Sequence, residues 1–190
     1  MRMKKPFART RCPMVDNFLA RMLLRWGYRS RSLAANERQF SAAVAEIDGL
    51  VSTAADAVLR GRRPIKSLPG ITATMQSWSA FMTIDHVNGV HEAMLELIRE
   101  LEADRDCDVG DIGRFDHPPG DCGPEVMPRF RDLAGRIAGL PQSYPFTGRG
   151  TFLHPFSGRL TSRGGYALLA FHVRLHVPHV RHSIEVNAGS

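Results

Sequence analysis

The sequence lacks several short motifs that usually identify an enzyme class. It contains no Gly-rich phosphate-binding loop, no Cys-x-x-Cys pair and no G-x-S-x-G nucleophile elbow. These absences remove the simplest arguments for a nucleotide-binding protein, a thioredoxin-like redox protein or an α/β-hydrolase. A function must therefore be argued from other residue types.

Long apolar runs are missing as well. No uninterrupted run approaches the ~20 residues that span a bilayer, so we expect no membrane association. The apolar stretch at residues 18–26 follows a basic N-terminus, but Arg21 and Arg25 interrupt it. A secretory signal has a continuous apolar segment, so this pattern argues against one.

Cysteine is scarce. The three cysteines, Cys12, Cys107 and Cys122, cannot all pair within one chain. We therefore expect free thiols in a reducing cytoplasm. A regulatory disulfide between Cys107 and Cys122, which flank a loop rich in Gly, Pro and acidic residues, is the weaker alternative.

Acidic residues are nearly absent from residues 1–31, which hold nine basic side chains and one acidic one, a charge of +8. The rest of the chain has 16 basic and 18 acidic residues and is close to neutral. We therefore divide the chain into a basic N-terminal extension, 1–31, and one folded domain, 32–188. The extension could contact nucleic acid or another anionic partner, but it carries no recognisable nucleic-acid motif, so a solvated extension is favoured.

Hydrophobic periodicity predicts helices throughout. Apolar residues recur at three- and four-residue steps in the segments 14–26, 33–60, about 75–103, about 124–138 and about 161–186. No segment alternates as a strand would, and residues 139–160 look like an irregular connector. The four helices of the body predict an all-α four-helix bundle. Pro178 should bend the last helix just after His176 or end it there.

Histidines in the last predicted helix are the most informative feature. His172, His176 and His179 have offsets of four and three residues, which places them on one helix face. A His-x-x-x-His pair on a helix is a common way to hold a first-row transition metal. The alternative is a surface that happens to be rich in histidine, and a third ligand from elsewhere is needed to choose between them.

Four histidines could supply that ligand: His86, His91, His117 and His154. His117 and His154 precede prolines in predicted loops, which hold ligands less precisely than helices do. His91 lies within the apolar seam of the second long helix, and His86 lies at the edge of that seam. The spacing does not choose between these two, and either could be a core histidine. Asp85 and Glu92 could orient an imidazole, although solvated surface is the favoured interpretation.

Two motifs resemble the DinB/YfiT-like superfamily. Residues 78–87 (WSAFMTIDHV) resemble its second-helix signature, in which a tryptophan precedes a metal-binding histidine by eight residues. Residues 154–161 (HPFSGRLT) resemble the HP-x-x-G-x-L-T segment at the start of its last helix. His172 and His176 then fall where the His-x-x-x-His pair of that family falls. The resemblance covers roughly residues 33–186.

The resemblance implies a four-helix bundle in which His86, His172 and His176 hold a divalent metal, zinc or nickel. Three protein ligands leave a coordination position open for water or a thiolate, as in catalytic zinc sites. The chain differs from the family in having His179 where glutamine is usual and a proline at 178.

Two functions follow as expectations. The first is a cytoplasmic metal-dependent hydrolase or thiol S-transferase that acts on a small molecule, with a low-molecular-weight thiol as a possible cosubstrate. The alternative is a non-catalytic metal-binding or stress-response module, which could be a homodimer and could use residues 1–31 to bind an anionic partner. No individual catalytic residue is assigned.

Overall fold

The computed structural model describes residues 31–108, 118, 120–154 and 157–189. The predicted helix at 14–26, Cys12 and His117 lie outside these ranges, so the predictions made for them remain predictions. Nearly all of the basic extension also lies outside them.

Two helices occupy the segment predicted as one helix over 33–60. Helix α2 (Leu33–Thr53) begins after Ser32, whose Oγ accepts a hydrogen bond from the backbone N–H of Ala35 at 3.1 Å. It ends at Ala54, where the backbone becomes extended, and α3 (Asp56–Arg60) follows. The prediction of a single helix was wrong here.

Side-chain hydrogen bonds accompany the early end of α2. The hydroxyl groups of Ser52 and Thr53 donate to the carbonyl of Gly49 at 3.0 and 3.1 Å. Such bonds satisfy backbone carbonyls without continuing the helix, which weakens the helical pattern near its end.

Helix α4 (Ala80–Glu102) begins later than the predicted residue 75. A short 3-10 helix, η1 (Met75–Ser77), precedes it, and Trp78 and Ser79 have extended backbones. The Ser79 Oγ caps α4 by accepting from the N–H of Met82 at 3.1 Å. The serine cap therefore sets the start of the helix that carries His86.

The remaining helices match the predicted segments closely. Helix α5 (Val126–Ala138) is followed by the short α6 (Leu140–Ser143), and α7 (Ser162–Ala188) closes the chain. Pro178 lies inside α7, which continues beyond it for ten residues. The expectation that the helix could end after His176 was therefore wrong. Val177 and Val180 are buried on either side of the proline, and this packing offsets its lost hydrogen bond.

A small hairpin interrupts the predicted irregular connector. Strands β1 (Phe152–His154) and β2 (Gly158–Leu160) pair antiparallel, with Phe152 opposite Leu160 and both side chains buried. The prediction of no strand was wrong at this point, because three-residue strands are too short to show an alternating pattern.

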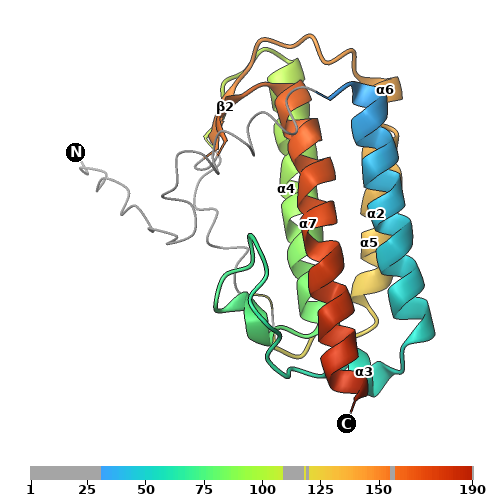
Figure 1. The fold of residues 1–190 in the computed structure, drawn as a ribbon. Helices are drawn as coiled ribbons and strands as arrows, with labels where there is room; N and C mark the ends of the chain where they lie inside the picture. The colour runs from blue at the N-terminus through green and yellow to red at the C-terminus, as the bar shows by residue number, and fades with distance from the viewer. Residues whose placement is uncertain (1–30, 109–117, 119, 155–156, 190) are drawn as a thin grey trace.

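The long helices α2, α4, α5 and α7 run alongside one another in Figure 1, with α4 and α7 in opposite directions. Helix α7 packs against α2 and α4, and α5 packs against α4 and α2. Their facing side chains form one buried core, which includes Phe40, Ile47, Ile84, Phe130 and Val173. The all-α class predicted from the sequence is confirmed.

Two further observations concern the chain as a whole. Of the helices in the described ranges, none combines the length and apolarity that crossing a bilayer requires. Cys107 and Cys122 are separate thiols, so the weaker alternative of a disulfide between them is wrong for this structure.

Candidate metal centre

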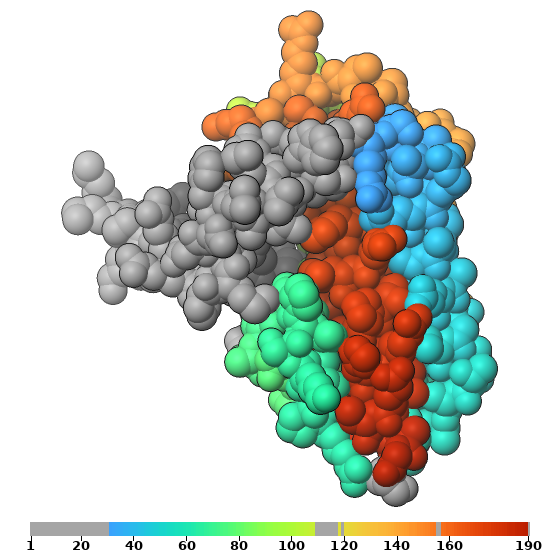
Figure 2. Space-filling view, in the orientation of Figure 1, coloured from blue at the N-terminus to red at the C-terminus, as the bar shows by residue number. Residues whose placement is uncertain are grey.

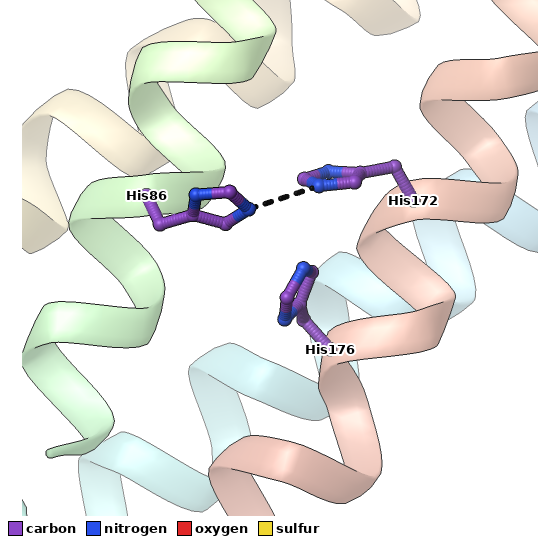
Figure 3. Close-up of side chains that lie close together, drawn as sticks. All are labelled: His86, His172 and His176. Carbon is purple, nitrogen blue, oxygen red and sulfur yellow. Dashed lines mark hydrogen bonds between the residues drawn. The ribbon is translucent and has the colours of Figure 1, made fainter. Parts of the chain in front are cut away.

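Three histidines from two helices converge in the interior. His86 lies on α4, and His172 and His176 lie one turn apart on α7. One ring nitrogen from each lies within 4.8 Å of one from each of the others. Figure 3 shows the His86 ring directed from its helix toward the two rings of α7. These are the three residues that the sequence analysis favoured.

The helix geometry explains why the rings meet. Residues four apart on a helix lie on the same face, so His172 and His176 project together. That face packs against α4, which runs in the opposite direction (Figure 1). His86 follows two buried core residues of α4, Thr83 and Ile84, and its own side chain is only 6% exposed. Ordinary core packing therefore brings the two helices into register at this point.

The distance between two of the ring nitrogens fits a first-row metal. The Nε2 atoms of His86 and His172 are 3.2 Å apart. A tetrahedral ion with bonds of about 2.05 Å to nitrogen places its ligands about 3.3 Å apart. The ring centroid of His176 lies 4.9 Å from that of His86 and 4.6 Å from that of His172. A hydrogen bond between two imidazoles would explain the first contact alone, but it does not explain the convergence of three.

Burial keeps two of these imidazoles in the form that binds metals. His176 is 2% exposed, and His172 is partly buried. Burial, followed by the charges of neighbouring histidines, lowers the pKa of His172 and of His176 well below the ordinary value. Both rings are therefore neutral at pH 7, and a neutral imidazole offers a lone pair to a metal.

His179 does not join this group, although it lies on the same side of α7. Its Nε2 lies 3.0 Å from the carbonyl oxygen of Met75, and its Nδ1 lies 3.4 Å from the Nδ1 of His176. Its ring stacks on Trp78 with centroids 6.2 Å apart. The face of three α7 histidines is therefore not the ligand set that the structure assembles.

His91 lies close to the group but outside it. Its ring centroid is 6.3 Å from that of His172 and 5.6 Å from that of Phe40, and its side chain is fully buried. Neither ring nitrogen has a hydrogen-bond partner among the described residues. Burial, with a smaller effect of His86, lowers the pKa of His91 to about 3. The sequence analysis left His91 open as a candidate ligand or a core histidine, and the structure places it beside His172 but outside the converging group.

The other candidates lie elsewhere. His154 is in β1, where its Nδ1 accepts a hydrogen bond from the N–H of Ser157 at 3.1 Å, and burial lowers its pKa to about 4. Asp85 and Glu92 both pair with Arg129, at 3.6 and 2.5 Å. Since Glu92 and Arg129 are largely exposed, the interpretation of Glu92 as solvated surface agrees with the structure.

The described part of the chain carries surface clefts away from the histidine group, and two of them can be given by their linings. One of about 680 Å³ is lined by residues that include Arg99, Tyr144 and Arg149. The other, of about 320 Å³, is lined by Asp85, Asp121, Cys122, Glu125, Val126 and Arg129. Neither lining includes the three converging histidines.

Comparison with known proteins gives no independent assignment: no protein-family model, curated protein or solved structure matches the chain. The function must therefore be argued from the histidine group itself.

Proposed function

We propose that this protein binds one divalent metal ion through His86, His172 and His176 and uses it as a metal-dependent enzyme. The activity we favour is hydrolysis or thiol S-transfer on a small molecule. The observation that carries the proposal is the convergence of three ring nitrogens within 4.8 Å, from helices far apart in the sequence.

The chemistry of the donor set supports this proposal. Imidazole is a suitable ligand for zinc and nickel, and burial favours its neutral form. Three protein ligands are the usual number in a catalytic zinc centre, whereas structural centres usually have four. A divalent ion held in this way supplies Lewis acidity, which activates a water or a thiol near neutral pH. The protein's own contribution is to fix the three rings and to surround two of them with core side chains.

We also propose that residues 32–188 form a four-helix bundle of the DinB/YfiT-like type. The packing of α7 on α2 and α4, and of α5 on α4 and α2, supports this architecture. Bundles commonly build metal sites from side chains on facing helices, as α4 and α7 would do here.

A non-catalytic metal-binding module is the second candidate. It is favoured by the burial of His86 and His176, which limits the access of a substrate to the ligands. Such a module could act as a homodimer in the cytoplasm, and residues 1–31 could bind nucleic acid or another anionic partner. A low-molecular-weight thiol remains the cosubstrate of the enzymatic alternative.

The metal content of the purified protein tests the proposed ligand set directly. Purified wild-type protein, loaded with zinc or nickel and desalted, should retain about one ion per chain. His172→Ala should lose it, because two imidazoles hold an ion far less tightly than three. His182→Ala is the matched control, since His182 lies on the same helix but is exposed and pairs with Glu185. Equal metal content in wild type and His172→Ala would refute the proposed ligand set.

A further inference from the structure

We infer that His179 is a positioning residue that fixes the ring tautomer of His176, so that His176 presents a bare Nε2 to the metal. The inference rests on the proposed metal site and adds a residue outside it. A neutral imidazole carries one N–H and one lone pair, so the bond made by one nitrogen decides what the other can do.

The first link identifies the protonated nitrogen of His179. Its Nε2 lies 3.0 Å from the carbonyl oxygen of Met75, which can only accept a hydrogen bond. Its other neighbour is the Thr83 Oγ1 at 3.5 Å. That hydroxyl lies 3.1 Å from the Ser79 carbonyl and donates its proton there, so toward His179 it can only accept. With two acceptors facing it, the Nε2 of His179 carries the hydrogen, and its Nδ1 carries the lone pair.

The second link is the contact through which the tautomer of His179 determines the tautomer of His176. The Nδ1 atoms of His179 and His176 lie 3.4 Å apart. Because the Nδ1 of His179 has no hydrogen, the Nδ1 of His176 must donate. The Nε2 of His176 is then unprotonated and is the nitrogen left to bind a metal. Metal-ligating histidines commonly donate their second N–H to an outer partner in this way, which fixes both the tautomer and the ring direction.

Packing holds in place the hydrogen-bonded chain that runs from the Met75 carbonyl through His179 to His176. His179 is fully buried, and its ring stacks on Trp78 at an interplanar angle of 23°. The Met75 carbonyl belongs to η1 and also accepts from the N–H of Trp78 at 3.0 Å, so the acceptor is fixed by local backbone structure. His172 differs, since its buried Nδ1 has no hydrogen-bond partner among the described residues. The structure therefore orients the two α7 ligands unequally.

Two substitutions distinguish the effect of the hydrogen bonds of His179 from the effect of its packing. His179→Leu replaces the imidazole with an apolar side chain of similar size and so removes both hydrogen bonds. His179→Gln can restore them, because an amide oxygen can accept from the Nδ1–H of His176 while the amide nitrogen donates to the Met75 carbonyl. His182→Leu, at the exposed histidine of α7, controls for the loss of any imidazole.

The experiment combines two measurements on the full-length chain. Nitrogen-15 NMR of the metal-free protein reports which ring nitrogen of His176 carries the proton, and chelator competition gives the zinc affinity. We expect the Nδ1–H form of His176 in wild type, His179→Gln and His182→Leu. In His179→Leu we expect the Nε2–H form to become populated and zinc affinity to fall about 10- to 100-fold, with affinity retained in His179→Gln.

Two results would overturn the inference. One is a wild-type protein in which His176 is protonated at Nε2, a reading that needs no variant to fold. The other is a His179→Leu protein with wild-type tautomer and affinity. Failure of the wild type to bind zinc would instead refute the proposed metal site. The tautomer of the metal-free protein is measured separately, so the two failures can be distinguished.

Discussion

Burial decides the chemistry of individual histidines in this protein. His91 and His86 could not be ranked as ligands from their spacing, because both lie on or near the apolar seam of one helix. In the structure His86 points to the two rings of α7, whereas both nitrogens of His91 lack a hydrogen-bond partner among the described residues. The resemblance to a known motif selected His86, and periodicity alone could not, since it reports faces of a helix and not side-chain directions.

Replacing His91 tests this difference. His91→Leu removes, at nearly constant volume, a buried polar ring whose two nitrogens have no hydrogen-bond partner among the described residues. We expect the free energy of unfolding to rise by about 1–3 kcal/mol, because an unsatisfied buried polar group costs roughly that much. Zinc affinity should be unchanged. Denaturant unfolding and chelator competition measure the two quantities, and a loss of zinc binding would show that His91 is a ligand.

Helix boundaries depend on short polar contacts that periodicity does not register. The apolar stripes located all four long helices, but the Ser79 cap delays α4, and the Ser52 and Thr53 hydroxyls bond back near the end of α2. The hairpin of β1 and β2 was missed because its strands have three residues each. In helix α7 the error is the opposite one, because the helix is longer than local preference indicates. Tertiary packing keeps it helical beyond Pro178, where local preference would end it.

Pro178→Ala tests how much that proline lowers the free energy of unfolding. Proline cannot donate to the carbonyl four residues earlier, at Arg174, and alanine can. We expect the variant to be more stable by about 1–3 kcal/mol, somewhat less than the full helix-propensity difference because proline also restricts the unfolded chain. Thermal and denaturant unfolding measure the change. A destabilised variant would contradict this expectation.

At the scale of the whole molecule, burial lowers the pKa values of five histidines, four of them on helices α4 and α7 and one in strand β1. They are His91, His154, His172, His176 and His179. A core that buries so many titratable rings is stable only where they are neutral. The fold and the proposed metal site therefore share a dependence on pH.

This dependence gives a measurable pH profile for the metal-free protein. The lowered pKa values mean that the unfolded chain takes up protons below its ordinary histidine value of 6.5, while His91 and His179 of the folded chain stay neutral until about pH 3 and 4. The free energy of unfolding should thus change little between pH 7.5 and pH 7 and fall as the pH drops below 6.5. Each extra proton contributes a slope of about 1.4 kcal/mol per pH unit.

Urea titrations between pH 7.5 and 4.5 measure this profile. His91→Leu should lower the slope of the free energy of unfolding against pH by the contribution of about one proton. A stability that is flat from pH 7 to pH 5 would contradict the burial of these rings as neutral groups.

X-ray absorption spectroscopy at the zinc edge of the loaded protein tests the central claim most directly, because it counts the ligands of the bound ion. The account predicts three imidazoles at about 2.0–2.1 Å and one further light-atom ligand that exchanges with added thiol or solvent. Four imidazoles, a protein thiolate, or a spectrum unchanged by His86→Ala would contradict a centre built from His86, His172 and His176.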